Sequence, residues 1–188
     1  MGFAFAFLGI IALIVLFPYI RCFFKRLKCA RKIKKLCRQK GYRISKTHKL
    51  WFLGNKYDKK CDLHVETENE VFSIKLFGMP RRLSILILKE NGEFFIRSYI
   101  ALISSYSSFL SPINSKPKQL PVYDFKFGYR NEWDSKTQRH ILLINPISME
   151  TRRQPHHGGE IVISSGDFVN GMEIYSLPRL LEDMENAQ

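Results

Sequence analysis

Acidic residues are missing from the first 57 positions of the chain, which hold 14 Lys or Arg and no Asp or Glu. Positions 58–188 hold 16 Lys or Arg against 17 Asp or Glu, so they contribute −1 to the total formal charge of +13. A nucleic-acid-binding domain would carry its positive charge on a folded binding face. Here the excess precedes the main body of the chain, which argues against nucleic acid as a partner.

Cysteine is scarce and unevenly placed. Three of the four cysteines, Cys22, Cys29 and Cys37, lie close together near the N-terminus, and only Cys61 lies further on. This is not a disulfide framework, and it fits a reducing cytosol. Cys61-x-x-His64 lacks the second paired cluster of a zinc site, so the cysteines predict no metal.

Recognised catalytic motifs are also absent. The chain has no Gly-rich phosphate loop, no nucleophile elbow and no HExxH helix. His156-His157 precede two glycines in an expected loop, where adjacent residues seldom turn toward one ion. We therefore assign no catalytic, cofactor-binding or metal-binding residue and expect no cofactor. Whether the protein is an enzyme stays open, and the lack of a catalytic motif favours the view that it is not.

Charge is absent altogether from positions 3–20, FAFAFLGIIALIVLFPYI, where 12 of the 18 side chains are Phe, Leu, Ile or Val. As a helix, this run would extend about 27 Å, close to the hydrocarbon thickness of a bilayer. A buried core helix would show a polar face, and this run has none. We expect residues 1–20 to form a transmembrane anchor.

The flanks of this run predict its orientation. A secretory signal would have Lys or Arg ahead of the run and a small-x-small cleavage site after it, and both are missing. Positions 21–40 instead hold ten Lys or Arg. The positive-inside rule then places the short N-terminus outside and everything from Arg21 onward in the cytosol, as a single-pass membrane protein.

Residues 21–41 have the pattern of a basic amphipathic helix, which we call the stem, with Gly41 as its C-terminal cap. Arg26, Lys34 and Lys40 interrupt its apolar side. Two alternatives are open: the stem lies on the headgroups, or it packs on the following domain. Anionic lipid is the expected partner, and the residues predicted to contact the membrane surface are Arg21, Lys25, Arg26, Lys28, Arg31, Lys32 and Lys35.

After Gly41 the period changes to that of strands, so residues 42–188 are expected to form a cytosolic β-rich domain. Asn91-Gly92 predicts a hairpin turn. The expected strands are Leu50–Leu53, Asp62–Thr67, Val71–Phe77, Leu83–Leu88, Phe94–Tyr99, Val122–Phe127, Arg139–Ile144, Ile147–Arg152, Ile161–Ser164 and Met172–Tyr175. We expect a mainly β (α+β) fold: an antiparallel β-meander that follows the two N-terminal helices.

Two further segments complete this layout. Residues 104–119 are rich in Ser and Pro and are interpreted as a long connection, near which the domain is either subdivided into two layers or continuous as one curled sheet. The tail SLPRLLEDMEN returns to a helical period, with Leu177, Leu180, Leu181 and Met184 on one side. It predicts a short C-terminal helix that covers the edge or the end of a sheet.

The best enzyme candidate combines Asp62 with Ser73-Ile74-Lys75. Its spacing loosely resembles that of the restriction-endonuclease-like family, in which an Asp near one strand and an acidic-x-Lys on its neighbour hold a divalent ion and orient water. Ser73 replaces one expected carboxylate here, so the resemblance implies at most a divergent site. The alternating surface of a strand explains Asp62, Glu66 and Lys75 equally well.

Two classes of function remain. The first is a membrane tether for a cytosolic interaction or sensor domain that recruits a protein partner, and the absence of a catalytic cluster favours it. The alternative is a membrane-anchored hydrolase or nuclease-like enzyme with a divergent site around Asp62 and Lys75.

Overall fold

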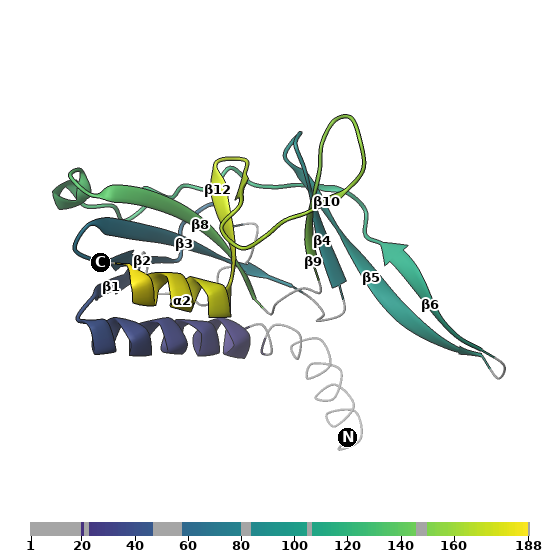
Figure 1. The fold of residues 1–188 in the computed structure, drawn as a ribbon, viewed down its shortest axis with the longest axis horizontal. Coiled ribbons are helices and arrows are strands. Elements are labelled where there is room, and N and C mark those ends of the chain that lie inside the picture. Colours follow the sequence, from purple (N-terminus) through teal and green to yellow (C-terminus); the bar gives the residue numbers. More distant parts are fainter. Residues whose placement is uncertain are drawn as a thin grey trace, which may run out of the picture.

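The computed structural model describes residues 20, 23–46, 58–79, 84–104, 107–145 and 150–187, with backbone only at 99–104 and 107–112. The expected anchor and the expected strand at Leu50–Leu53 lie outside these residues. Within them the fold is mainly β with two α-helices, as predicted (Figure 1). The stem helix occupies residues 23–40, and the C-terminal helix α2 runs from Leu177 to Asn186.

The described strands form two sheets of mixed direction. Sheet 1 has the order β1-β2-β3-β8-β12-β11, and sheet 2 has the order β10-β9-β4-β5-β6, with β7 also paired to β5. Sheet 1 contains β1 (Arg43–Lys46), β2 (Leu63–Glu66), β3 (Glu70–Gly78), β8 (Thr137–Asn145), β11 (Phe168–Val169) and β12 (Met172–Ser176). Sheet 2 contains β4 (Ser84–Lys89), β5 (Glu93–Ser104), β6 (Ser107–Asn114), β7 (Lys118–Gln119), β9 (Glu150–Gln154) and β10 (Ile161–Val162). A short 3-10 helix, η2 (Asn131–Trp133), precedes β8.

The expected antiparallel meander is found only in part. Strands β1–β2–β3 and β4–β5–β6 pair antiparallel in chain order, but the pairs β3–β8, β8–β12 and β4–β9 are parallel, and each needs a crossover connection. The chain leaves sheet 1 after β3, builds β4 to β7 of sheet 2, returns for β8, leaves again for β9 and β10, and returns for β11 and β12. The two sheets are therefore interleaved along the chain rather than divided near 104–119.

Two other expectations need correction. Residues 107–114 are not part of a connection but form strand β6, which pairs with β5. Residues 122–127, expected as a strand, form only an isolated bridge between Asp124 and Lys60 and then a turn. Tyr123 and Phe125 nevertheless pack into the core, so the apolar alternation there reflects burial of a loop.

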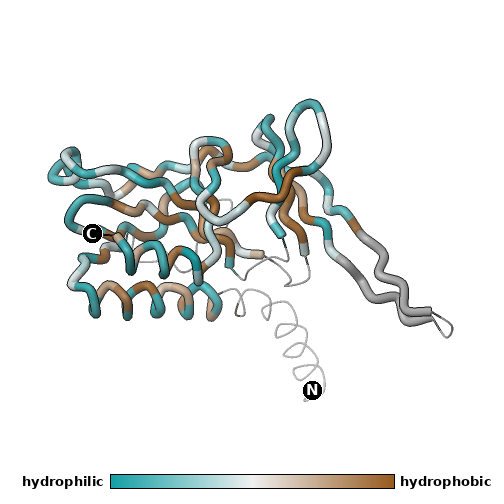
Figure 2. The backbone as a smooth tube through the Cα atoms, in the orientation of Figure 1, coloured by the Kyte–Doolittle hydropathy of each residue, from teal (hydrophilic) through white to brown (hydrophobic). Residues whose placement is uncertain are grey.

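Sheet 1 is covered on both faces. On one face the stem helix and α2 lie against Leu63, Phe72, Ile74 and their neighbours, and Figure 1 shows the two helices side by side below the sheet. On the other face Phe77 and Leu142 join residues of sheet 2 in a second core. Figure 2 shows the apolar positions concentrated along the strands and the hydrophilic ones in the outer turns. Because both faces of the sheet are covered, the residues of β3 from Val71 to Phe77 are all buried, Ser73 and Lys75 included.

The local signals explain the ends of these elements. Asn170 and Gly171 both have positive φ, as a two-residue turn between β11 and β12 requires. At the predicted β4–β5 hairpin only Gly92 has positive φ, because the loop has three residues rather than two. Helix α2 buries Leu180 and Met184, one turn apart, as its period predicted.

Candidate functional site

The stem helix has two chemically distinct faces, and its apolar face packs on the domain rather than on lipid. Cys29, Ala30, Ile33, Leu36 and Cys37 are buried in the core between the stem and sheet 1. Further contacts hold both ends of the helix: Asn145 Nδ2 donates to the Lys25 carbonyl at 3.0 Å, and Lys40 Nζ donates to the Glu185 carbonyl at 2.8 Å. The hydrophobic core of the domain thus includes the stem, although the sequence analysis placed the start of the domain after residue 41.

The opposite face of the stem is basic and open to solvent. Its exposed cations are Lys28, Arg31, Lys32, Lys34, Lys35, Arg38 and Lys40. Four of the residues predicted to contact the membrane surface lie on this face: Lys28, Arg31, Lys32 and Lys35. Of the others, Lys25 is half-buried and Arg21 lies outside the described residues. A cleft of about 350 Å³ between the side chains from Arg31 to Gln39 also includes Lys34 and Arg38, which the sequence pattern did not place there.

Arg26 is the exception among the predicted contacts, and its assignment to the membrane surface is wrong. Its side chain is buried, and its Nη2 donates to Asp62 Oδ1 at 2.6 Å. A second nitrogen, Nη1, donates to the Leu76 carbonyl at 3.4 Å. The guanidinium therefore joins the stem to the sheet inside the domain.

Asp62 and Lys75, the enzyme candidate, do come together in the same centre. Lys75 Nζ lies 3.8 Å from Asp62 Oδ2, and both side chains are fully buried. Asp62 Oδ2 also accepts the Leu76 amide at 2.8 Å, and Lys75 Nζ donates to the Lys60 carbonyl at 2.6 Å. The strand-surface interpretation is therefore wrong for Asp62 and Lys75, whereas Glu66 is only partly buried and pairs with Lys136 at 3.0 Å.

The electrostatics of this centre oppose its ionised states. Burial raises the pKa of Asp62, against the opposing effect of Arg26 and then Lys75. Burial likewise lowers the pKa of Lys75, against the effect of Asp62. Asp62 Oδ1 accepts from Arg26, and Asp62 Oδ2 accepts from the Leu76 amide and faces Lys75, so both oxygens are engaged within the domain. The arrangement works as a buried structural ion centre.

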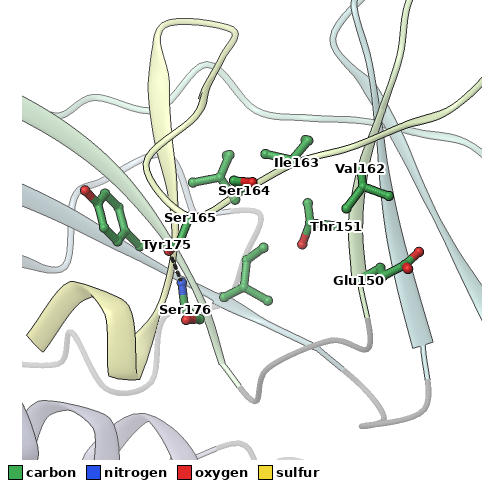
Figure 3. Close-up of a pocket in the computed structure, with 10 residues that line it drawn as sticks. Glu150, Thr151, Val162, Ile163, Ser164, Ser165, Tyr175 and Ser176 are labelled. Carbon is green, nitrogen blue, oxygen red and sulfur yellow. Dashed lines mark hydrogen bonds between the residues drawn. The ribbon is translucent and has the colours of Figure 1, made fainter. Parts of the chain in front are cut away.

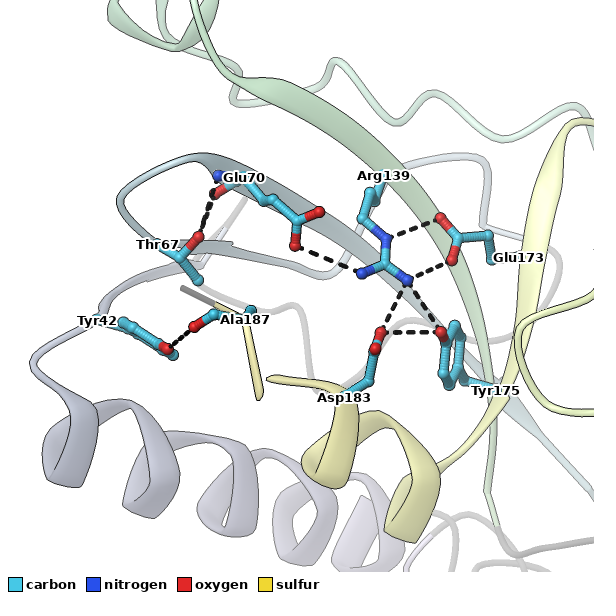
Figure 4. A network of polar contacts seen from close by, with 8 residues as sticks. All are labelled: Tyr42, Thr67, Glu70, Arg139, Glu173, Tyr175, Asp183 and Ala187. Carbon is cyan, nitrogen blue, oxygen red and sulfur yellow. Dashed lines mark hydrogen bonds and ion pairs between the residues drawn. The ribbon is translucent and has the colours of Figure 1, made fainter. Parts of the chain in front are cut away.

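A second charged centre surrounds Arg139 on β8 (Figure 4). Its guanidinium donates two hydrogen bonds to Glu173 in a bidentate ion pair, from Nε to Oε1 at 3.0 Å and from Nη2 to Oε2 at 2.6 Å. Nη2 also lies 2.8 Å from Asp183 Oδ2 on α2. Tyr175 donates its hydroxyl to the same Asp183 oxygen at 2.9 Å. The hydrogen bonds to Glu173 raise the pKa of Arg139, so its charge is permanent. This centre fastens α2 to the sheet.

The described histidines do not form a single cluster, although His64 and His140 lie on either side of Ser73. His64 is buried: its Nε2 donates to the Phe127 carbonyl, and its Nδ1 accepts the Ser73 hydroxyl, both at 2.9 Å. His140 stacks on Phe125 at 4.8 Å, whereas His156 and His157 are exposed in their loop. Among the described residues no group of three His, Cys, Asp or Glu is placed to hold a metal ion.

The described thiols are also unsuited to chemistry. Burial raises the pKa of Cys29 and of Cys61 to about 12, and that of Cys37 to about 11. Because the thiolate is the reactive form, these three side chains behave as small apolar core residues.

Two further cavities lie away from these centres. One, of about 220 Å³, lies between β9, β10 and β12 and is lined by Thr151, Val162 and Ser164 among others (Figure 3). The other, of about 440 Å³, lies beside the β4–β5 turn and includes His140. Neither these cavities nor the cleft on the stem is lined by Asp62 or Lys75.

The comparisons with known proteins leave the site to be judged on its own geometry. No family model, curated protein or solved structure matches the chain. In the part of the chain that the structure describes, no helix has the length and apolar character needed to cross a membrane. The expected span at residues 3–20 falls almost entirely outside that part.

Proposed function

We propose that the protein is a single-pass membrane protein that holds a cytosolic β-rich interaction domain directly against the membrane surface. The apolar run at 3–20 is the anchor, with the short N-terminus outside. The stem is both part of the domain's core and its membrane-facing side. This combination distinguishes the proposal from a domain on a flexible tether.

The burial of Arg26 carries the proposal. The apolar run ends at Ile20, and six residues later the Arg26 guanidinium is fixed inside the domain on Asp62. Even a fully extended chain of six residues spans at most about 22 Å, and a helical one spans about 9 Å. An anchor at 3–20 would therefore hold the core of the domain close to the headgroups.

The basic face of the stem matches such a position. Because the apolar face packs on sheet 1, the exposed cations lie on the remaining surface of the stem, apart from Lys40, which donates to the Glu185 carbonyl. Each Lys or Arg near an anionic leaflet contributes about 1 kcal/mol or less, so the face supplies several kcal/mol at most. That is enough to orient an anchored domain.

The opposite side of the molecule offers edges suited to a protein partner. Ile161 and Val162 on β10 and Phe168 on β11 are more than half exposed, and both strands end their sheets. Short open edges with apolar side chains recruit extended partner segments by strand addition. The enzyme alternative is less well supported, because the hydrogen bonds within the domain already occupy Asp62.

The topology can be tested with a cysteine in place of exposed Lys116, introduced into a Cys22→Ser chain so that the remaining thiols are the buried ones. We expect the protein to remain in membranes after alkaline washing. An impermeant maleimide should label it only after the cells are opened, and lysed cells serve as the reactivity control. Labelling of intact cells would refute the orientation, and release by the wash would refute the anchor.

The contribution of the basic face is tested by the double charge reversal Arg31→Glu with Lys35→Glu, with Lys126→Glu as the matched control. Lys126 is exposed in the turn that follows the Asp124–Lys60 bridge, whose neighbours Tyr123 and Phe125 pack on the core opposite the stem. In a Trp51→Phe chain, in which Trp133 is the one tryptophan, energy transfer from Trp133 to a headgroup-labelled lipid in phosphatidylserine vesicles should be weaker for the double variant. Equal transfer in all three proteins would contradict this role.

A further inference from the structure

The cleft on the exposed face of the stem is built by cations at helical spacing. It has a volume of about 350 Å³ and is lined by Arg31, Lys34, Lys35, Arg38 and Gln39. Side chains three, four and seven positions apart lie on one side of a helix, so these cations surround the hollow from successive turns. We call this group the basic cleft. Because the apolar face of the stem is packed on sheet 1, the cleft is carried by a fixed element of the domain.

The cations of the basic cleft have no acidic counterpart. The first 57 positions hold no Asp or Glu, so the stem itself supplies no counter-charge. In the part of the chain that the structure describes, none of these four side chains takes part in an ion pair or a side-chain hydrogen bond. Arginines elsewhere in the domain do pair with carboxylates, as in Arg97–Glu160, Arg152–Glu150 and Arg179–Glu182. The four positive charges of the cleft are therefore not neutralised by the described domain.

This arrangement destabilises the stem unless an anion is bound. Like charges four positions apart on a helix repel each other, and the cleft contains two such pairs, Arg31–Lys35 and Lys34–Arg38. An anion held between the four side chains replaces that repulsion with attraction. The combination of unpaired cations, a hollow between them and a fixed backbone therefore favours an anionic ligand over a merely solvated surface.

The number and kind of the cations indicate the class of anion. A phosphomonoester carries a charge of about −1.5 to −2 at neutral pH and three strong acceptor oxygens, so two such groups balance four cations. The forked donors of Arg match phosphate oxygens, and Lys adds a point charge on a flexible stem. A volume of about 350 Å³ lies at the lower end of the range for small-ligand sites, about 300–1,000 Å³.

We propose that the basic cleft binds a ligand that carries two or more phosphomonoester groups close together, as an inositol trisphosphate or the headgroup of a phosphatidylinositol bisphosphate does. Arg31 and Arg38, about 10 Å apart along the helix axis, contact phosphate oxygens at the two ends of the cleft. Lys34 and Lys35 balance the charge between them. The proposal rests on the proposed function only for a lipid-borne ligand, because the anchor is what brings the cleft to the headgroups.

The test titrates the full chain, held in phosphatidylcholine nanodiscs, with soluble inositol trisphosphate in a calorimeter. Lys34→Ala with Arg38→Ala removes two charges from the cleft. Lys28→Ala with Lys32→Ala is the matched control, because it removes two exposed charges from the same helix outside the cleft. The first variant should weaken binding about tenfold or more, since it loses charged hydrogen bonds to the ligand, and the control by less than about threefold. Unchanged melting temperatures of both variants confirm that the fold is kept.

The same titration in nanodiscs that contain phosphatidylinositol bisphosphate identifies the source of the ligand. Loss of the binding heat there supports a lipid headgroup in the cleft, and an unchanged heat supports a soluble phosphate. Equal weakening in the two double variants would overturn the proposal, because it would show attraction to charge density alone. Equally tight binding of a double-stranded RNA in the same cleft would overturn it as well. A chain that fails to enter nanodiscs refutes the anchor of the proposed function, and the cleft is then judged by the same titration in solution.

Discussion

Replacing Arg26 with Ala tests whether the stem is joined to the core by charge as well as by packing. The change removes the 2.6 Å contact to Asp62 and leaves the carboxylate with the Leu76 amide at 2.8 Å and Lys75 at 3.8 Å. Removing one partner of a buried ion pair costs about 3–5 kcal/mol. Because Lys75 remains, we expect the lower end, about 3 kcal/mol, which is a large part of the 5–15 kcal/mol that holds a typical domain folded.

The measurement is the free energy of unfolding of residues 21–188 in urea, followed by tryptophan fluorescence, to which both Trp51 and buried Trp133 contribute. Lys28→Ala is the matched control, because Lys28 is exposed on the same helix and should change stability by less than about 0.5 kcal/mol. Adding Asp62→Asn to Arg26→Ala should recover part of the loss, since the uncompensated charge is gone. A coupling energy near 2 kcal/mol is expected in this double-mutant cycle.

Equal stability of the Arg26→Ala and Lys28→Ala proteins would refute the reasoning. It would mean that Asp62 is neutral in the folded protein and gains nothing from the guanidinium. A change in the m-value, the slope of the free energy of unfolding against urea concentration, would instead indicate that the variant no longer unfolds in two states from a compact native state.

Two further predictions concern the same core. Burial lowers the pKa of His64 from 6.5, so the unfolded chain binds this proton more readily, and the contribution of His64 to stability is full above pH 6.5 and falls as the pH drops below it. His64→Gln should flatten the decline in melting temperature between pH 7 and pH 5 or so, with the slope that remains due to His140 and other groups. Residues 42–188 should lack the cooperative unfolding of residues 21–188, because removal of the stem exposes the sheet face that Ile33 and Leu36 cover; equal amide protection in the two fragments would contradict this.

The sequence allowed most strands to be located but not their neighbours. Periodicity of two identified β3, β4 and β8 to within a few residues, and the spacing of Leu180 and Met184 identified α2. Parallel pairing could not be predicted, because alternation reports which faces are buried and carries no information on which strand lies alongside. Residues 107–114 were missed because Ser and Pro are typical of loops, yet Pro112 is tolerated on the edge strand β6.

The candidate site was predicted only in part, for a different reason. Spacing along neighbouring strands brought Asp62 and Lys75 together correctly, but their third partner lies 36 residues before Asp62, on another element. The one available signal was that Arg26 interrupts the apolar side of the stem. A cation on the buried face of a helix requires a buried anion, and Asp62 is the residue that supplies it.

The dual use of the stem limits how this protein can recruit a partner. Because Ile33 and Leu36 hold the helix on sheet 1, its basic face cannot turn toward the membrane independently of the domain. In the proposed arrangement, charge on that face would orient the whole domain, and the side that carries the stem would be closed to a partner. A partner segment would then approach from β10 and β11, where Val162 and Phe168 are exposed on the last strands of their sheets. In the proposed arrangement, membrane attachment leaves those edges facing the cytosol.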